Sequence, residues 1–308
     1  MHVAVFGGSG FVGRYLVDAL IEAGHEPSLL VRPSSEDKVL RAEECRLISG
    51  DLGNRDAVET AVSGCDAVIY NVGILREDAA RGITFEAMQY DGVVQVCNAA
   101  MAQGISRFLL MSANGVRRPG TPYQETKARA EEHVKSAGFA ATVFRPSVIF
   151  GDPRGAMEIA SQLHRDMIRP PLPAAGFFSG WRPSRGQVVM SPVHVEDVAQ
   201  AFVAALGNPA TVGETYRLGG PETLTWVEML QRIAAAVGKR KSIVPVPLAA
   251  MGLLATLLDG LPFFPVTRDQ LKMLAQGNSA DPNALEALLG RPATAFARDN
   301  LSYLAAAG

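Results

Sequence analysis

The sequence has few of the residues from which disulfide frameworks and metal centres are built. Among its 308 residues are five histidines and three cysteines, Cys45, Cys65 and Cys97. The cysteines are odd in number and far apart, and the histidines lack the spacing of metal ligands. This pattern argues against a disulfide scaffold and against a metal site, and it is typical of a protein in a reducing compartment.

Positive charge is not in excess either, because the formal net charge is −2. A dedicated nucleic-acid-binding protein is therefore not expected. No leader segment precedes the first predicted strand, so we expect a cytoplasmic protein, with peripheral attachment to the inner face of the membrane as the alternative. Hydrophobic residues make up 48% of the chain and charged residues 19%, a balance that predicts a sizeable core.

One strongly apolar stretch, Pro247–Pro265, complicates this description. It is too short to span a bilayer, it is bounded by prolines, and Asp259 interrupts it. Two interpretations stay open for this stretch. It is either a buried helix of a small lobe or a surface that docks on a membrane or a partner protein.

What the sequence does have is a glycine-rich turn near its beginning. The apolar strand pattern Met1–Phe6 leads into this turn, and a helical pattern follows over Arg14–Ala23. The turn consists of Gly7, Gly8, Ser9, Gly10, Phe11, Val12 and Gly13. Glycines allow a close approach to a pyrophosphate, and the helix N-terminus offers unpaired N–H groups to that anion. A strand, a glycine-rich turn and a helix in this order predict a dinucleotide-binding site.

Strand and helix patterns then alternate through the first half of the chain. Strands are expected at residues 27–31, 45–49, 66–70, 107–111 and 141–145, and helices at residues 54–62, 84–103 and 123–136. This succession predicts an α/β fold with a Rossmann-type doubly wound parallel sheet. We expect a dinucleotide-binding domain over residues 1–150 and a smaller, mostly helical C-terminal lobe for the substrate over residues 151–308.

The second half of the chain is less regular. A helix is expected at residues 157–168, and a long loop should reach to Met190. Phe177, Phe178 and Trp181 in that loop could form a lid over a substrate or pack the loop against the protein. A helix at 195–206 and a strand at 214–218 should return to the first domain, so the two domains interleave.

Tyr123 and Lys127 are the first candidate catalytic pair. Four residues separate them at the start of a predicted helix, so their side chains share one helical face. A nearby ammonium should lower the pKa of the tyrosine toward a value useful for proton transfer. The lysine is also placed to hold the ribose of a nicotinamide cofactor.

With these motifs in order, the chain resembles the short-chain dehydrogenase/reductase superfamily, of the extended or atypical kind. The glycine-rich turn and Tyr123…Lys127 are joined by residues 50–52, 71–73, 145–151 and 192–198 in the family's order. Within the superfamily, the chain is most similar to the bacterial proteins related to the nucleotide-binding accessory subunit of respiratory complex I. Residues 267–274 and 288–292 add to this likeness.

The resemblance implies a role for each matching residue. The glycine-rich turn would line the pyrophosphate, and Lys127 would bind the nicotinamide ribose. The remaining cofactor contacts that it implies come from Asp51 and Leu52 at the adenine, from Asn71, Val72 and Gly73 at the adenosine ribose, and from Pro146, Ser147 and Val148 beside the nicotinamide.

Arg32 bears on the choice of cofactor. In this fold an acidic residue after the second strand pairs with the ribose 2′-hydroxyl of NAD, whereas an arginine accommodates the 2′-phosphate of NADP. Here Arg32 and Ser34 follow the strand, and the first acid is Glu36. The sequence therefore favours NADP(H) over NAD(H).

The sequence departs from the superfamily where a substrate oxygen would be bound. Active relatives carry a serine or threonine after the fifth strand, and here Ser112 begins that segment while Asn114 occupies the usual hydroxyl position. Asparagine can donate a hydrogen bond but cannot relay a proton. An asparagine expected in the preceding helix is also replaced, by Gln89 or Tyr90.

Three functions remain open at this point. The first is an NADP(H)-dependent oxidoreductase, with Tyr123 as general acid or base and Ser112 or Asn114 polarising a carbonyl, alcohol or quinone oxygen. The second is a non-catalytic NAD(P)H-binding accessory or assembly protein linked to the respiratory chain or quinone metabolism. The third is a nucleotide-sugar epimerase or dehydratase. The substrate and the oligomeric state are not fixed by the sequence.

Overall fold

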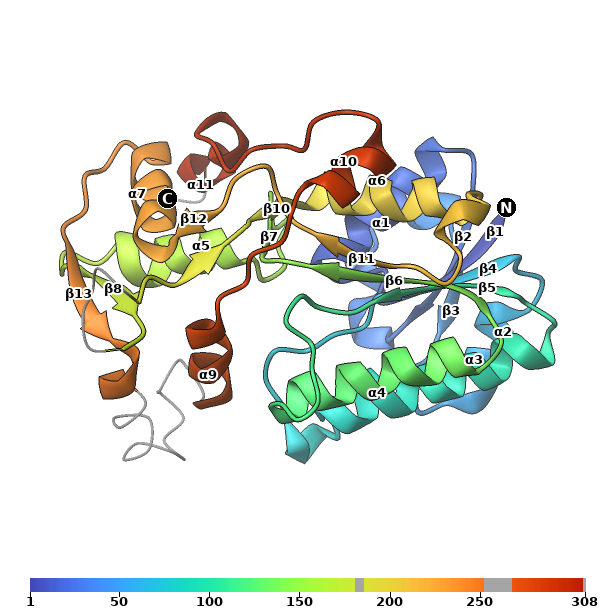
Figure 1. Ribbon diagram of the computed structural model, residues 1–308. Helices are drawn as coiled ribbons and strands as arrows, with labels where there is room; N and C mark the ends of the chain where they lie inside the picture. The colour runs from blue at the N-terminus through green and yellow to red at the C-terminus, as the bar shows by residue number, and fades with distance from the viewer. Residues whose placement is uncertain (181–185, 252–267, 307–308) are drawn as a thin grey trace. The chain divides into compact units, whose positions relative to one another are not determined.

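The computed structural model describes residues 1–180, 186–251 and 268–306 (Figure 1). The chain divides into two compact units, and it passes between them more than once. Unit 1 consists of residues 1–146, 195–217 and 284–291, and unit 2 consists of residues 147–194, 218–283 and 292–308. The boundary after Pro146 lies four residues before the one expected from the sequence, and residues 284–291 belong with unit 1.

Unit 1 contains a seven-stranded sheet in the order β11-β6-β5-β4-β1-β2-β3. The strands are β1 (His2–Phe6), β2 (Glu26–Val31), β3 (Arg46–Ser49), β4 (Ala67–Tyr70), β5 (Arg107–Met111), β6 (Ala140–Pro146) and β11 (Thr215–Leu218). The first six strands pair with one another in parallel. The strand order reverses between β1 and β4, which is where doubly wound sheets bind their ligands. The expected Rossmann-type fold is confirmed.

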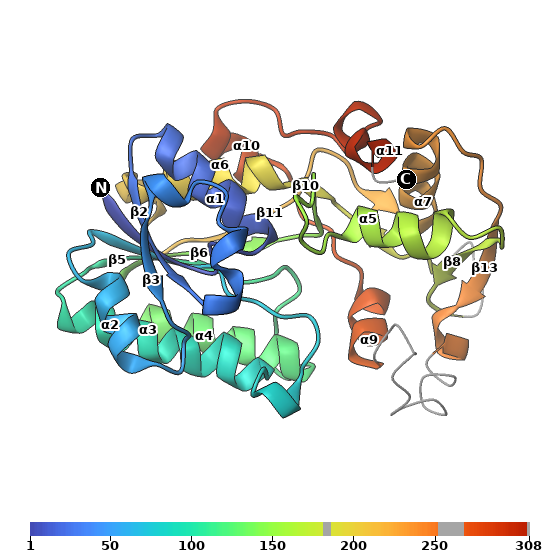
Figure 2. The same ribbon diagram turned by 180° about the vertical axis from the view of Figure 1, so that it is seen from behind.

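Helices cover both faces of this sheet (Figures 1 and 2). On one face lie α2 (Arg55–Val62), α3 (Gly92–Ala102) and α4 (Pro122–Ser136), and on the other lie α1 (Phe11–Glu22), α6 (Val195–Leu206) and α10 (Asn283–Leu289). Short 3₁₀ turns connect several elements of both units, at Pro33–Lys38, Ala42–Glu44, Ala79–Arg81, Pro209–Thr211 and Asp299–Leu301. On the face of the sheet that α2, α3 and α4 cover, apolar side chains of the strands and of these three helices form the core. The carboxyl ends of the strands therefore stand on a rigid, two-sided scaffold.

The helix expected over residues 84–103 is not regular along its length. A π-helical segment, η4 (Glu86–Asp91), precedes α3. The buried hydroxyl of Tyr70 donates to the carbonyl oxygen of Met88 at 2.5 Å, inside this segment. A side chain that enters the helical hydrogen-bond ladder is a known cause of such an irregularity. Gly92 makes room for Tyr70, because a Cβ there would stand 2.4 Å from the Tyr70 hydroxyl oxygen.

Unit 2 combines short helices with small two-stranded sheets, so it is less helical than expected. Its described elements are β7 (Ile149–Phe150), α5 (Ile159–Leu163), the π-helical turn η5 (His164–Ile168), β8 (Ala174–Phe178), β9 (Val189–Met190), β10 (Val193–His194), β12 (Leu224–Thr225), α7 (Trp226–Ala236), β13 (Ile243–Pro247), α9 (Arg268–Gln276) and α11 (Tyr303–Ala306). The pairs are β7 with β10, β8 with β13 and β9 with β12.

The prediction of a long loop before Met190 is wrong for part of that segment. Strand β8 lies there and pairs in parallel with β13. Phe177 and Phe178 are only 6% and 7% exposed, and Phe177 packs on the ring of Trp226 at 5.4 Å between centroids. These two phenylalanines are core residues of unit 2 and not a lid. Trp181, and most of the apolar stretch that ends at Pro265, lie outside the described residues.

No helix within the described ranges has the length and apolar character needed to span a bilayer.

Arg107 ties the returning segment of the chain to the sheet of unit 1. This arginine of β5 is 8% exposed and donates to the carbonyl oxygens of Ala205 and Leu206 at the end of α6, at 2.6 and 3.2 Å. It also donates to the Thr211 hydroxyl at 2.9 Å and to the carbonyl of Ala140 in β6 at 2.5 Å. One buried guanidinium thus satisfies the C-terminal carbonyls of α6 and cross-links two strands.

Replacing Arg107 by leucine should destabilise unit 1. Four acceptors lose the hydrogen bonds that the guanidinium donates, and the free energy of unfolding should fall by about 3 kcal/mol. Thermal and urea unfolding followed by circular dichroism measure this loss. Arg55→Leu is the control, because Arg55 makes an exposed pair with Glu59 that contributes about 0.5 kcal/mol or less. Equal effects of the two substitutions would contradict the role given to Arg107.

Candidate cofactor and active site

The glycine-rich turn leaves the N-terminus of α1 without a side-chain cap. Gly10 is the N-cap residue, and no side chain accepts a hydrogen bond from the first turn at this position. Within the turn, the N–H of Gly10 donates to the carbonyl oxygen of Gly7 at 3.2 Å, and the N–H of Arg14 donates to Gly10 at 3.1 Å. The remaining N–H groups of the first turn are the donors that a phosphate requires.

In this turn there is no room for a side chain at Gly7 or Gly13, whereas there is room for one at Gly10. A Cβ on Gly13 would stand 2.0 Å from the Gly7 carbonyl oxygen and 2.8 Å from the Gly8 Cα. Gly7 has φ of +92°, and a Cβ there would stand 2.9 Å from the carbonyl oxygen of Asn71. At exposed Gly10 the nearest atom to such a Cβ is 3.4 Å away. A backbone cradle that opens at Gly10 fits the pyrophosphate of a dinucleotide.

Arg14 was not among the residues expected from the sequence. Its side chain is only 6% exposed, and Nε donates to the carbonyl oxygen of Ser9 at 3.2 Å. This buried guanidinium holds the outer part of the turn against α1. Phe11 packs edge-on against Tyr15 at 6.1 Å, and Val12 is half-buried, so both anchor the turn. The signal in the sequence is an arginine directly after the last glycine of the turn.

The segment after β4 joins the glycine-rich turn to the candidate catalytic helix. The N–H of Asn71 donates to the carbonyl oxygen of Phe6 at 2.9 Å, which places Asn71 beside the end of β1. The next carbonyl, that of Val72, accepts a hydrogen bond from Lys127 Nζ at 3.3 Å. A Cβ on Gly73 would stand 3.6 Å from the same Nζ. The structure therefore brings Asn71, Val72 and Gly73 together with Lys127.

Lys127 lies between the ends of two strands. Besides the Val72 carbonyl, Nζ donates to the carbonyl oxygen of Met111 at the end of β5, at 2.9 Å. Helix α4 presents this lysine because a capping box of Thr121 and Gln124 fixes the helix start. Lys127 is only 3% exposed, and burial lowers the pKa of its ammonium to about 8, although Glu131 opposes the shift.

The pKa of Tyr123 differs from the sequence expectation. Burial raises the pKa of this half-buried phenol to about 12, and Lys127 does not lower it. The reason is that the ammonium of Lys127 is directed to the two backbone carbonyls of Val72 and Met111. The Tyr123 ring packs edge-on against Phe85 at 5.7 Å. At neutral pH the tyrosine is therefore protonated, and its raised pKa makes it a weaker acid than a free phenol.

Ser112 does not point its proton at a substrate oxygen. It is 4% exposed, and its hydroxyl donates to a carboxylate oxygen of buried Glu131 on α4. Glu131 also accepts two hydrogen bonds from Arg145 of β6, at 2.8 and 2.5 Å. A hydroxyl carries one proton, and Ser112 donates it to Glu131. In this structure Ser112 is therefore part of a buried network and is not arranged for the catalytic role expected from the sequence. Glu131 and Arg145 were not foreseen as site residues.

Asn114 and Gln89 occupy the two positions where the sequence departs from its relatives. The N–H of Asn114 donates to the carbonyl oxygen of Pro146 at 2.9 Å, so the segment after β5 is tied to the end of β6. Gln89 is fully buried, donates to the carbonyl oxygen of Ile74 at 3.0 Å and accepts from the Thr126 hydroxyl at 3.0 Å. Gln89 thus fixes the start of α4 against η4 and the segment after β4.

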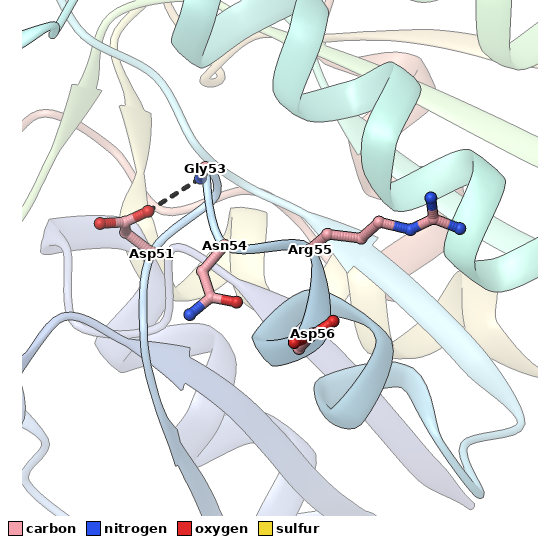
Figure 3. Close-up of a pocket in the computed structure, with 5 residues that line it drawn as sticks. All are labelled: Asp51, Gly53, Asn54, Arg55 and Asp56. Atoms are coloured by element: carbon pink, nitrogen blue, oxygen red, sulfur yellow. Dashed lines mark hydrogen bonds between the residues drawn. The ribbon is translucent and has the colours of Figure 1, made fainter.

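Asp51 lies in a shallow hollow after β3 (Figure 3). Its carboxylate accepts a hydrogen bond from the N–H of Gly53 at 2.8 Å, while Asn54 caps α2. In Figure 3 the Arg55 side chain extends away from Asp51, so the carboxylate stands on an open surface. Leu52 packs against the core beside it. An exposed carboxylate next to an apolar side chain is suited to an adenine base.

Arg32 and Ser34 are both exposed after β2. Arg32 precedes the 3₁₀ turn Pro33–Lys38 and is its N-cap residue. The first acidic side chain there, that of Glu36, is also exposed and lies within the turn. The end of β2 therefore presents a guanidinium and a hydroxyl to solvent.

The three residues expected beside a nicotinamide fall on both sides of the unit boundary. Pro146 ends β6 in unit 1, and Ser147 and Val148 begin unit 2. Within unit 2, the N–H of Ser147 donates to the carbonyl oxygen of Leu218 at 2.8 Å, and its hydroxyl donates to that of Asn278 at 2.5 Å. Ser147 is 5% exposed, so these bonds fix the start of unit 2.

Across the described ranges, no cluster of three or more His, Cys, Asp or Glu side chains could hold a metal ion.

Comparison with known proteins agrees with this geometry. A family model described as NAD(P)H-binding matches residues 7–169, more than half of the chain. A ceramide reductase of Caulobacter vibrioides is 30% identical over 80% of this chain and 73% of its own length. The mitochondrial 40 kDa subunit of NADH-ubiquinone oxidoreductase of Neurospora crassa is 28% identical over 92% of this chain and 73% of its own length.

Solved structures share the fold at lower identity. A UDP-glucose 4-epimerase of Thermus thermophilus, solved in complex with NAD, superposes with a TM-score of 0.75 at 20% identity. The match covers 99% of this chain and 98% of the epimerase. At this identity the likeness concerns the fold alone.

Gly13→Ala and Gly10→Ala should separate folding from nucleotide binding. Alanine at residue 13 forces its Cβ against backbone atoms that cannot move aside, so the free energy of unfolding should fall by about 2–3 kcal/mol. Alanine at residue 10 meets no such clash and should cost less than about 1 kcal/mol, the difference between glycine and alanine as N-cap residues. Urea unfolding measures both losses.

The same two variants are then titrated with NADPH. Gly10→Ala places a methyl group on the open side of the cradle, so the folded variant should bind the nucleotide at least about tenfold more weakly. Unchanged affinity in Gly10→Ala would show that the nucleotide does not approach the turn from that side.

Proposed function

The chain belongs to the NAD(P)H-binding family, and we propose that it is an NADP(H)-dependent reductase of the short-chain dehydrogenase/reductase type, acting on the carbonyl group of a ketone or a quinone. The observation that carries this proposal is the position of Lys127. Its ammonium is buried between the ends of β4 and β5, next to the segment that packs on the glycine-rich turn. A buried cation beside such a turn is suited to binding an anionic or polyhydroxyl ligand.

In this proposal the residues of unit 1 hold the cofactor in chain order. The glycine-rich turn binds the pyrophosphate, Asp51 and Leu52 meet the adenine, and Lys127 binds the nicotinamide ribose. Residues 71–73 line the ribose on the adenosine side, and Pro146 at the end of β6 flanks the nicotinamide. The cradle that opens at Gly10 and the exposed carboxylate in Figure 3 support these assignments.

Tyr123 is the proposed general acid. When bound, NADPH supplies the hydride that reduces the carbonyl carbon. Tyr123 donates its phenolic proton to the carbonyl oxygen, which completes an alcohol, and the phenolate then takes a proton from solvent. Burial raises the pKa of the phenol to about 12, so the proton is present at neutral pH and its transfer needs a carbonyl oxygen that gains negative charge as the hydride arrives. Asn114 is the proposed hydrogen-bond donor to the same oxygen, because the Ser112 hydroxyl is bound to Glu131.

NADPH is the proposed form of the cofactor because of the charge after β2. Arg32 and Ser34 are exposed there, where an acidic residue would pair with the 2′-hydroxyl of NAD. A guanidinium forms charge-assisted hydrogen bonds with a phosphate. An NAD-dependent nucleotide-sugar epimerase is the less favoured alternative for the same reason.

A second candidate function is a non-catalytic nucleotide-binding subunit. The commitment of Ser112 to Glu131 favours it, because the usual hydroxyl position holds Asn114 and the one nearby serine hydroxyl of this segment is bonded to a buried carboxylate. The likeness to a subunit of NADH-ubiquinone oxidoreductase points the same way. In that case a bound NADPH would be retained without turnover, and the partner would be a respiratory complex.

Arg32→Glu should reverse the nucleotide preference. The wild-type protein, freed of nucleotide, should bind NADPH about tenfold or more tightly than NADH, since a charge-assisted pair contributes about 1.5–3 kcal/mol. The variant places a carboxylate where the 2′-phosphate would lie, so the NADPH affinity should fall below that for NADH. Fluorescence titration with both nucleotides measures the ratio.

Arg46→Glu is the control for a general change of charge, because Arg46 of β3 donates to the carbonyl oxygens of Thr60 and Ser63 at the other end of the sheet. A wild-type preference for NADH would contradict the role of Arg32, and no binding of either nucleotide would remove the whole proposal.

Tyr123→Phe should abolish turnover and leave NADPH binding within about twofold of wild type, because the variant loses the proton donor and keeps the ring. NADPH oxidation is followed with a panel of ketones and quinones, and the dissociation constant is measured separately. Full activity in the variant would exclude Tyr123 as the acid. Tight NADPH binding by the wild type without oxidation by any compound would favour the non-catalytic subunit.

A further inference from the structure

A buried network of three polar side chains lies behind the candidate cofactor site. Glu131 of α4 is 3% exposed and receives two hydrogen bonds from Arg145 of β6 and one from the Ser112 hydroxyl. Three elements, α4, β6 and the end of β5, therefore meet at one carboxylate. Removing a carboxylate from water costs several kcal/mol, so such a group needs all of its partners.

This network adjoins Lys127 in two ways. Glu131 lies one helical turn after Lys127 on α4, so the two side chains share a face of the helix. Ser112, which donates to Glu131, follows Met111, whose carbonyl accepts a hydrogen bond from Lys127. Two charged side chains of α4 thus bind two consecutive residues at the end of β5: Lys127 binds the carbonyl of Met111, and Glu131 binds the hydroxyl of Ser112.

We propose that Glu131, oriented by Arg145 and Ser112, is a positioning residue that holds the Lys127 ammonium charged and directed at the ends of β4 and β5. The inference rests on the proposed function, in which Lys127 binds the nicotinamide ribose.

The surroundings of Lys127 show why a carboxylate is needed nearby. The ends of β4 and β5 contribute the carbonyls of Val72 and Met111, and η4 contributes the neutral amide of Gln89 close to the start of α4. Tyr123, one turn earlier on α4, is uncharged at neutral pH because burial raises its pKa to about 12. Arg145 of β6 is a cation that Glu131 pairs.

Among these groups, Glu131 supplies the negative charge that opposes the effect of burial on Lys127, whose pKa is lowered to about 8. Without that charge, the lysine should lose its proton at a lower pH. An uncharged amine interacts less well with an anionic dinucleotide, so nucleotide affinity should report the change.

The test is the pH dependence of NADPH binding in Glu131→Gln, which removes the charge and keeps the shape. In the wild type, affinity should decrease as the pH rises through about 8, where Lys127 loses its proton. In the variant, the midpoint of this decrease should move down by about 0.5–1 pH unit, and binding near pH 7.5 should weaken about threefold. Titrations above about pH 7 avoid protonation of the 2′-phosphate.

Glu132→Gln is the matched control. Glu132 is the next residue of α4 and makes an exposed ion pair with Arg118 at 2.7 Å. This variant removes the same charge from the same helix and should leave both the affinity and its midpoint unchanged.

Glu131→Asp separates charge from packing. The shorter carboxylate keeps the negative charge, so the midpoint of the pH-dependent decrease in affinity should stay near that of the wild type. This should hold even if the altered packing lowers the affinity by the same factor at every pH. If Glu131→Gln does not fold, Ser112→Ala takes its place, because it loses one hydrogen bond of Glu131 and keeps the pair with Arg145. Its midpoint should move in the same direction by a smaller amount.

The outcomes distinguish the two proposals. No binding of NADPH or NADH by the folded wild type would overturn the proposed function. Normal wild-type binding, with a uniform loss of affinity in Glu131→Gln and no shift of midpoint, would overturn the positioning role and leave the proposed function standing. A midpoint that shifts equally in Glu131→Gln and Glu132→Gln would also overturn it.

Discussion

The structure of the candidate site depends on two hydrogen bonds from one buried ammonium. Lys127 Nζ donates to the carbonyl oxygens of Val72 and Met111, which are the groups exposed where β4 and β5 end. A parallel sheet leaves such carbonyls at its carboxyl edge, and a buried cation is a strong partner for them. By joining both strands to α4, Lys127 fixes the segment that also packs on the glycine-rich turn. The glycine-rich turn and α4 are therefore parts of one hydrogen-bonded edge.

The same constraint accounts for the side chains that surround this lysine. A buried ammonium loses its hydration, and its pKa falls to about 8. The nearby carboxylate of Glu131 opposes that loss, but it is itself buried and draws in Arg145 and Ser112 as partners. Ser112 is thereby withdrawn from the substrate side, and the neighbouring Asn114 remains as the polar side chain at the usual hydroxyl position. The carboxylate that opposes the effect of burial on Lys127 thus takes up the hydroxyl of Ser112.

The sequence predicted those features that rest on local pattern. The alternation of apolar strands and amphipathic helices gave the strands of unit 1, and the glycine spacing located the cradle, because both depend on residues close together in the chain. Features set by distant contacts were missed. The π-helical segment before α3 arises from the hydroxyl of Tyr70, and β8 exists because β13 pairs with it from about 70 residues away. The pKa of Tyr123 was expected to fall and instead rises, since spacing placed Lys127 nearby but could not show that its ammonium faces two carbonyls.

The choice between an enzyme and a nucleotide-binding subunit turns on one proton donor. The proposed roles of the glycine-rich turn, of Arg32 and of the Lys127–Glu131 arrangement all concern cofactor binding, and both candidate functions require them equally. In the proposed enzyme Tyr123 is the group for proton transfer, and because burial raises its pKa to about 12 it stays protonated near neutral pH and is a weak acid there. A site with this acid and without a free serine has enough groups for reduction of an easily polarised carbonyl.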